Sequence, residues 1–322
     1  MRKVLIIRLG KIGDIVVTSF VFETIKSNYP HIDIYILTLK SNMGVLEFNP
    51  RIKKGFYSGN NLMLLWNLVK LKFLNFDLIL DFNDNSSTTS SLILRFLSSK
   101  FKAAYNYDIY KNITNIKIRP LEKTESHIIE RTRNYLNQMG IAINEKNVKP
   151  FFYLDPVALK EIKHQKWDNK KIITLNLSAG AEIRYWGKDK WIELIKLILK
   201  VRPGFGILLL STAKDEPLRK YIQTNIIESI SPSVKNLTIQ QFASYIKISA
   251  VLITPDTSAV HIASAFGIPT IAMYPNFESN FISWQPYKIP YRSIKSSAES
   301  IKDIAVKEVY SAFQSLINEI RL

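Results

Sequence analysis

The residues best placed to do chemistry lie in the turn that follows the first apolar stretch of the chain. The apolar run over residues 4–9 predicts a β-strand, and it leads through Gly10 and Gly13 to Asp14 at the start of a predicted helix. In an open α/β sheet, ligands gather beyond the carboxyl ends of the strands, so Asp14 is placed to accept a proton from a bound hydroxyl. Capping of the helix is the commoner role for such an Asp, and from this turn alone it is the better supported one.

A second group follows the strand predicted over residues 171–177. Ser178 and Gly180 are small enough to leave room for a ligand. The guanidinium of Arg184 can bind a pair of phosphate oxygens. Its alternative role is a surface charge beside a tryptophan of the core.

A third group opens the helix predicted over residues 258–266. Asp256 or Thr257 would cap this helix, and the amides of Thr257 and Ser258 would face an anion at its N-terminus. His261 lies about one turn beyond Thr257, so both side chains are expected to face one cleft. A capped helix with a buried histidine is an alternative of equal weight.

Two further strand ends carry carboxylates. Asp215 lies between a strand predicted over residues 205–211 and the next helix, where it would either accept hydrogen bonds from sugar hydroxyls or, more simply, cap the helix. The run Asp81-Phe82-Asn83-Asp84 also follows a strand, and we interpret it as a turn rather than a metal site.

The elements that position these groups alternate along the chain. Strand-length apolar runs followed by amphipathic helices predict βαβ units, among them a helix from about residue 13 to 27 and a strand at residues 270–274. The pattern stops at Gly140 and restarts at residue 171. A length of 322 residues agrees with two domains. We predict an α/β protein with two doubly wound domains and a binding cleft between them. The expected boundaries are residues 1–150, a linker at 151–170, residues 171–300 and a final amphipathic helix within 301–322.

Composition narrows the class of protein. A net charge of +17 suggests an acidic partner such as nucleic acid, an anionic membrane face or a phosphorylated substrate, although solvated lysines explain it equally well. No long basic run supports a nucleic-acid tail. There is no cysteine, and the four histidines lack metal-ligand spacing, so no zinc site is expected. No apolar run reaches the roughly 18 residues of a membrane span, and the N-terminus looks like a strand rather than a signal peptide. We expect a cytoplasmic protein.

Common nucleotide and hydrolase motifs are missing from the sequence. The first turn lacks the G-x-G-x-x-G spacing, and neither a P-loop nor a G-x-S-x-G elbow occurs. The missing glycine spacing argues against an NAD-dependent epimerase or dehydrogenase acting on a sugar nucleotide. That class and a non-catalytic sugar-nucleotide-binding module are kept as alternatives.

Two stretches together resemble the signatures of the family 9 glycosyltransferases, the lipopolysaccharide heptosyltransferase family. Residues 8–16, RLGKIGDIV, resemble the family's opening R-x-x-x-x-G-D-x-x, and residues 256–270, DTSAVHIASAFGIPT, resemble its D-T-G-x-x-H-x-A-x-A-x-G-x-P-T. Weaker similarities are found at residues 178–181, at Arg184-Tyr185-Trp186 against the family's K-x-W, and at Asp215. The resemblance spans nearly the whole chain.

The resemblance implies a GT-B fold with two Rossmann-like domains facing a central cleft. The N-terminal domain would bind the acceptor, the C-terminal domain the nucleotide-sugar, and the helix within 301–322 would pack back toward the N-terminal domain. The implied reaction is an inverting transfer of heptose from ADP-heptose to a lipopolysaccharide core, with no metal or other cofactor. It implies peripheral contact with the inner face of the bacterial inner membrane, where basic residues would meet anionic lipid, and no nucleic-acid partner.

The resemblance also assigns roles to individual residues. Asp14 would be the general base, and Gly10, Lys11 and Gly13 would form the floor of the acceptor site beside it. The donor-binding set would be Ser178, Gly180, Arg184, Asp215, Asp256, Thr257, Ser258 and His261.

Within the donor set the implied roles differ. Arg184, with the amides of Thr257 and Ser258, would stabilise the diphosphate, whereas Asp256 would contact the donor sugar and Asp215 the sugar or ribose. The family's usual lysine is Arg184 here, and its usual glycine after D-T is Ser258. Because both differences change how a donor is approached, another nucleotide-sugar is kept as an alternative donor.

Overall fold

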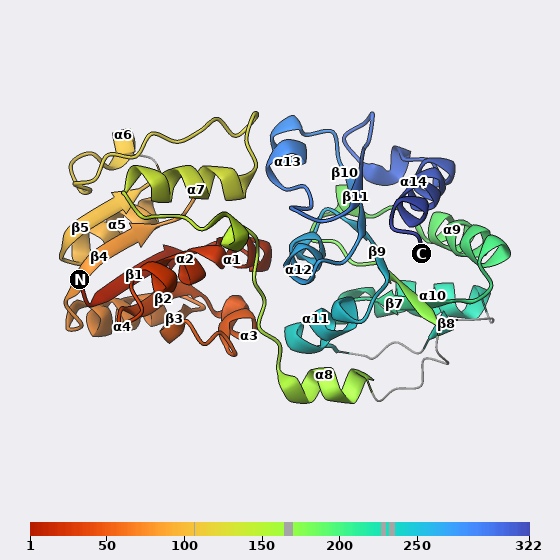
Figure 1. Cartoon of the computed structure of the whole chain (residues 1–322), viewed down its shortest axis with the longest axis horizontal. Helices are drawn as coiled ribbons and strands as arrows, with labels where there is room; N and C mark the ends of the chain where they lie inside the picture. Colours follow the sequence, from red (N-terminus) through yellow and green to blue (C-terminus); the bar gives the residue numbers. More distant parts are fainter. Residues whose placement is uncertain (106, 164–169, 227–229, 232–235) are drawn as a thin grey trace. The chain divides into compact units, whose positions relative to one another are not determined.

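The chain folds into two compact units, each built on a parallel β-sheet (Figure 1). The structure is a computed structural model that describes residues 1–105, 107–163, 170–226, 230–231 and 236–322. Unit 1 is Met1–Tyr153 and unit 2 is Leu154–Leu322, so the division falls inside the segment predicted as the linker. The α/β prediction with two doubly wound sheets is confirmed.

Unit 1 contains a five-stranded sheet with the order β3-β2-β1-β4-β5. Its elements are β1 (Lys3–Arg8), α1 (Ile12–Thr18), α2 (Phe20–Asn28), β2 (Asp33–Leu39), η1 (Lys40–Asn42), α3 (Met43–Leu46), β3 (Ile52–Ser58), α4 (Asn61–Lys72), β4 (Phe76–Asp81), α5 (Thr88–Phe96), β5 (Ser99–Ala104), α6 (Tyr107–Tyr110), α7 (Ile128–Gln138) and η2 (Glu145–Asn147). The strand order reverses between β1 and β4, and this switch point is where open α/β sheets bind ligands.

Two helices of unit 1, α4 and α5, pack on one face of its sheet. Leu68 and Leu71 of α4 and Ile93 of α5 are buried in one cluster with Leu5 and Ile7 of β1. β1 is buried along nearly its whole length, as expected for the central strand of a parallel sheet.

Unit 2 contains a six-stranded sheet with the order β11-β10-β9-β6-β7-β8. Its elements are α8 (Pro156–Lys163), β6 (Lys171–Asn176), η3 (Glu182–Arg184), α9 (Lys188–Val201), β7 (Phe205–Leu210), η4 (Ala213–Asp215), α10 (Glu216–Asn225), β8 (Ile230–Ser231), α11 (Ile239–Lys247), β9 (Val251–Pro255), α12 (Ser258–Phe266), β10 (Thr270–Tyr274), α13 (Glu278–Ser283), β11 (Tyr291–Lys295), η5 (Ile301–Asp303) and α14 (Val306–Glu319). This order is that of a dinucleotide-binding sheet, with the switch point between β6 and β9.

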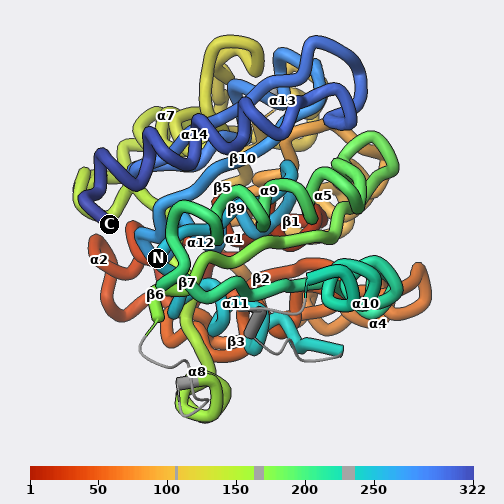
Figure 2. The backbone as a smooth tube through the Cα atoms, turned by 90° about the vertical axis from the view of Figure 1, so that its right-hand side faces the viewer, coloured from red at the N-terminus to blue at the C-terminus, as the bar shows by residue number. Residues whose placement is uncertain are grey.

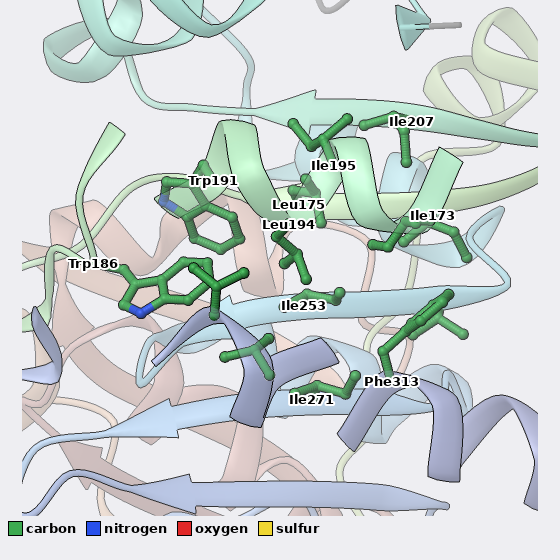
Figure 3. Close-up of a cluster of buried hydrophobic side chains, with 14 of the residues drawn as sticks. Ile173, Leu175, Trp186, Trp191, Leu194, Ile195, Ile207, Ile253, Ile271 and Phe313 are labelled. Carbon is green, nitrogen blue, oxygen red and sulfur yellow. The ribbon is translucent and has the colours of Figure 1, made fainter. Parts of the chain in front are cut away.

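The core of unit 2 is closed by the last helix, α14. Figure 3 shows the cluster, in which Phe313 lies with side chains of the strands and of α9. Trp186 and Trp191 meet edge to face with their ring centroids 4.9 Å apart, and the indole N–H of Trp186 donates to the carbonyl of Ile304 at 2.9 Å. The helix expected to pack toward the N-terminal domain therefore buries its apolar face in unit 2, beside α9 (Figure 2).

Candidate active site

Asp14 lies in the first turn of α1, directly after the central strand of unit 1. One carboxylate oxygen, Oδ1, accepts from the Nη2 of Arg8 at 2.6 Å, and the other, Oδ2, accepts from the backbone N–H of Lys11 at 2.7 Å. The Asp14 side chain nevertheless keeps 24 % of its surface exposed. Asp14 thus caps the helix, as one of its two expected roles requires, and also presents a fixed carboxylate to solvent.

Arg8 holds this carboxylate at the switch point of the sheet. Its side chain is buried at the end of β1, where it donates to the carbonyl of Phe82 beyond β4 as well as to Asp14. A guanidinium fork fixes a carboxylate more rigidly than a lysine ammonium does. No role for Arg8 was predicted beyond its place in the signature, because a partner 74 residues away cannot be identified from the spacing of a motif.

Gly10 is required by the position of Asp14. A Cβ atom built on Gly10 would lie 2.5 Å from the Cγ of Asp14 and 2.6 Å from its Oδ2, so any side chain there would displace the carboxylate. The Gly10 carbonyl is itself fixed by the Nδ2 of Asn42 at 2.8 Å. Of the other two residues predicted for the acceptor site, Lys11 is exposed and contributes its amide, and Gly13 lies within the first turn of α1.

Asp81 and Asn83 support the same turn from the end of β4. Asn83 Oδ1 accepts a hydrogen bond from the backbone N–H of Leu9 at 2.7 Å. Asn83 also donates two hydrogen bonds to Asp81 Oδ1, from its backbone N–H at 2.9 Å and from its side-chain Nδ2 at 2.6 Å. Burial raises the pKa of the Asp81 carboxyl to about 6, against the opposing effect of those hydrogen bonds and of the Arg8 charge. The turn expected at residues 81–84 is therefore also a brace for the Asp14 loop.

Replacing Asp81 with Asn is expected to remove a pH-dependent loss of stability. Because the folded-state pKa lies above the ordinary value of 3.8, the contribution of Asp81 is complete below about pH 4 and is lost as the pH rises through about 6. A shift of about 2 units corresponds to about 3 kcal/mol. In urea unfolding, Asp81→Asn should gain about 3 kcal/mol on the wild type between about pH 4 and about pH 7.

The matched control for this prediction is Asp77→Asn in the same strand. The backbone amides of Arg2 and Lys3 lower the pKa of Asp77, so its contribution is present above the ordinary carboxyl pKa and is lost as the pH falls. The two variants should therefore change relative to the wild type in opposite directions. A pH-independent difference for Asp81→Asn would contradict the raised pKa.

In unit 2, Arg184 is joined to Asp256 beyond the carboxyl edge of the sheet. Arg184 Nη1 donates to the Asp256 carbonyl at 3.1 Å, and Nη2 lies 3.1 Å from the Oδ2 of its carboxylate. The Arg184 side chain is 26 % exposed, and its Nε has no hydrogen-bond partner among the residues that the structure describes. The pair brings together two residues that the sequence placed in the donor site.

Asn176, at the end of β6, links the two strands of the unit 2 switch point. Its Nδ2 donates to the hydroxyls of Thr254 at 2.9 Å and of Thr257 at 3.1 Å. Beside it, Ser178 Oγ accepts from the N–H of Thr212 at 2.7 Å, which ties the loop after β6 to the loop after β7. Asn176 was not among the predicted site residues, although an Asn that ends a buried apolar strand was a signal that could have found it.

Both carboxylate oxygens of Asp215 accept hydrogen bonds from side chains of unit 2. Its Oδ1 accepts from the Tyr185 hydroxyl at 2.8 Å and its Oδ2 from the Thr212 hydroxyl at 2.9 Å. Burial is the main cause that raises the pKa of Tyr185 to about 12, and the hydrogen bond to Asp215 is the second. This phenol therefore keeps its proton. Asp215 thereby positions the residue next to Arg184, whereas its contact with a donor sugar stays a prediction.

The N-terminus of α12 is capped by Thr257, whose hydroxyl accepts from the N–H of Ala259 at 3.3 Å. Thr257 and Ser258 are half-buried, and the first amides of a helix have no partner within it, which suits them to an anion. His261 is 4 % exposed, and its ring centroid lies 5.6 Å from that of Trp284. This packing fits the buried-histidine alternative, and a contact between His261 and a donor stays a prediction.

Gly180 lies in open space at the same edge of the sheet. It is exposed, and a Cβ built on it would meet no atom within 4 Å. The room expected for a ligand after β6 is therefore present beside Ser178. The residues predicted for the donor site follow the carboxyl ends of three neighbouring strands, β6, β7 and β9. They are Ser178, Arg184, Asp215, Asp256, Thr257 and Ser258.

The described part of the chain contains neither a candidate membrane span nor a candidate metal site. None of its helices combines the length and apolar character needed to cross a bilayer. No three His, Asp or Glu side chains in that part gather closely enough to hold a metal ion.

Comparison with known proteins identifies the family. The model described as "Glycosyltransferase family 9 (heptosyltransferase)" matches residues 68–310, more than half of the chain. Lipopolysaccharide heptosyltransferase 3 of Escherichia coli K12 is 22 % identical, and the match covers 95 % of this chain and 96 % of that protein.

Solved structures share the fold over almost the full length. The family 9 glycosyl transferase from Veillonella parvula DSM 2008 superposes with a TM-score of 0.85 at 15 % identity, covering 99 % of this chain and 98 % of that one. The E. coli heptosyltransferase WaaC with ADP-2-deoxy-2-fluoro heptose gives a TM-score of 0.77 at 15 % identity, covering 99 % of both chains.

These matches and the two doubly wound sheets define a glycosyltransferase of the GT-B fold. The chain belongs to glycosyltransferase family 9, the heptosyltransferase family. The resemblance seen in the two sequence signatures is thereby confirmed.

Proposed function

We propose that the protein transfers heptose from ADP-heptose to a lipopolysaccharide core acceptor, with inversion at the anomeric carbon. Support for the donor and the acceptor comes from the relatives: the E. coli K12 protein is named a lipopolysaccharide heptosyltransferase, and the WaaC structure holds a fluorinated analogue of ADP-heptose. The proposed reaction places the enzyme at the cytoplasmic face of the inner membrane, in peripheral contact with the lipid that carries the acceptor. Unit 1 would bind the acceptor and unit 2 the donor.

The observation that carries the mechanism is the partly exposed, fixed carboxylate of Asp14. The acceptor hydroxyl oxygen attacks the anomeric carbon of the donor, the bond from that carbon to the diphosphate oxygen breaks, and the hydroxyl proton passes to Asp14. Arg8 and the Lys11 amide each occupy one site on the carboxylate, and each carboxylate oxygen has a second lone pair that can accept from the acceptor hydroxyl. The partners of Asp14 thus fix its orientation and leave its carboxylate able to accept the proton of the acceptor hydroxyl.

The leaving diphosphate gains negative charge as the bond breaks, and unit 2 supplies positive charge for it. Arg184 is held by Asp256, which fixes the direction of its guanidinium. The first amides of α12 add partial positive charge at the carboxyl edge of β9. Donors that are fixed before the reaction stabilise the developing charge without reorganisation, and this chemistry needs no metal.

Thermal unfolding in the presence of a panel of nucleotide-sugars tests the donor. A ligand present at about 100 times its Kd stabilises the native state by about 2.7 kcal/mol, which for a unit of this size raises the Tm by roughly 5–10 °C. We expect such a shift with ADP-heptose and with ADP, and none with UDP- or GDP-sugars. A shift with a UDP- or GDP-sugar alone would replace the donor, and a shift with NAD alone would favour the epimerase or dehydrogenase alternative.

A further inference from the structure

Helix α4 presents a second apolar face that the fold leaves uncovered. Its inner side is buried against the sheet through Leu68 and Leu71. On its outer side, exposed apolar residues recur at positions 62, 65, 66, 69 and 73, which is the spacing of one helical stripe. Leu62, Trp66 and Phe73 are 81 %, 62 % and 78 % exposed. A contiguous apolar stripe of this kind marks a site of association.

The stripe continues onto the neighbouring helix, α5. The Nζ of Lys72 in α4 lies over the ring of Phe96 in α5, 4.7 Å from its centroid, which brings the outer sides of the two helices together. Leu92, one turn before Phe96, is 66 % exposed. We call the surface formed by Leu62, Trp66, Phe73, Leu92 and Phe96 the α4–α5 outer face.

The charges around this face have one sign. Residues 61–73 and 88–102 contain Lys70, Lys72, Arg95, Lys100 and Lys102, and they contain no Asp or Glu. Lys70 lies over the ring of Trp66 at 4.8 Å, and Lys100 over that of Phe101 at 5.3 Å. Ammonium groups that lie over exposed aromatic rings place positive charge beside apolar surface, which suits a boundary between an apolar phase and anionic headgroups.

We propose that the α4–α5 outer face docks on the surface of an anionic phospholipid bilayer. Apolar and aromatic side chains would enter the interface, and the lysines and Arg95 would pair with lipid phosphates. The purpose of this docking rests on the proposed function, because a lipid-linked acceptor is held in a membrane. Both helices begin at the carboxyl edge of the unit 1 sheet, the edge at which Asp14 lies, so docking would bring that edge close to the membrane.

The test is flotation of the purified full-length protein with lipid vesicles. The wild type should bind vesicles of phosphatidylcholine mixed with phosphatidylglycerol, and more weakly those of phosphatidylcholine alone. Trp66→Gln with Phe73→Gln should lower the partition coefficient at least about tenfold, since burying each ring in the interface is worth about a factor of ten or more. Lys70→Gln with Lys72→Gln should lower it about tenfold on the anionic vesicles only, with the loss largest at low salt.

A control removes two comparably exposed apolar residues from unit 2. Val157→Gln with Val201→Gln, at positions 63 % and 55 % exposed, should leave vesicle binding unchanged. Each variant should keep the thermal shift with ADP, which separates membrane docking from the donor site and from folding.

Three outcomes would overturn the proposal. They are a wild type that binds neither kind of vesicle, a Trp66 and Phe73 variant that floats like the wild type, and a wild-type dimer in sedimentation that this variant abolishes. The last would make the face an interface between copies of the chain. A wild-type protein that binds anionic vesicles but transfers no sugar would count against the proposed function and not against the docking proposal.

Discussion

Replacing Asp14 with Asn is expected to lower kcat for sugar transfer by about 100- to 10,000-fold, the usual contribution of a general base. The amide cannot take the acceptor proton, and its Nδ2 would face the Nη2 of Arg8 or the Lys11 amide, two donors that the carboxylate now satisfies. Donor affinity should stay close to that of the wild type because the proposed donor residues lie in unit 2. Transfer rates at saturating donor and acceptor, together with the ADP-induced thermal shift, measure both effects.

Asp77→Asn is the matched control for this substitution. Asp77 also accepts from backbone amides, those of Arg2 at 2.5 Å and Lys3 at 3.0 Å, but it lies at the amino edge of the same sheet. We expect the control to keep its kcat. Turnover of Asp14→Asn within about tenfold of the wild type would remove Asp14 from the role of base.

Replacing Arg184 with Met is expected to lower kcat/KM by about 100- to 1,000-fold, or about 3–4 kcal/mol, through weaker stabilisation of the leaving diphosphate. The change also removes an ion pair of Asp256. The side chain of Asp256 is only 8 % exposed, so little water can replace the lost guanidinium. Arg184→Lys keeps the charge and matches the residue that the family resemblance places there, so it should be more active than Arg184→Met. It should stay below the wild type because one ammonium replaces the two guanidinium contacts with Asp256.

Lys188→Met provides the control for removing a cation from unit 2. Lys188 lies over the ring of Tyr221 at 4.1 Å and takes no part in the Arg184 and Asp256 pair. Its loss should leave donor affinity and kcat unchanged. An Arg184→Met enzyme with normal kcat/KM would show that the diphosphate is stabilised elsewhere.

The strands and helices that the sequence predicted best are those with an unbroken apolar or periodic pattern. The predicted strand at 270–274 and helix at 258–266 match β10 and α12 at both ends. The long helix predicted from residue 13 to 27 is instead two helices, α1 and α2, that meet at Ser19. The Ser19 hydroxyl donates to the Val16 carbonyl at 2.6 Å and accepts from the amide of Phe151 at 2.6 Å, a distant contact that no local pattern reveals.

Edge strands are where the sequence was least informative. β3 carries Lys53, Lys54 and Gly55, and β11 carries Arg292 and Lys295, so neither has the apolar run of a central strand. Charged residues are common on edge strands because they discourage pairing with other chains. The pattern that identifies buried strands therefore misses β3 and β11.

The candidate site also contains residues that local sequence patterns identify and residues that they do not. Asp14, Arg184, Asp256 and Thr257 follow strand ends and could be found from the sequence. Arg8 and Asn176 act through hydrogen bonds to residues more than 70 positions away, and the fold was needed to identify these partners.

The most direct test of the account is acceptor-dependent release of ADP from ADP-heptose by the wild-type enzyme. With a lipopolysaccharide core acceptor present, we predict that ADP and heptosylated acceptor form in equal amounts, and that Asp14→Asn binds the donor but releases almost none. An enzyme that binds ADP-heptose and transfers it to no core acceptor, or that transfers only from a UDP- or GDP-sugar, would contradict the account.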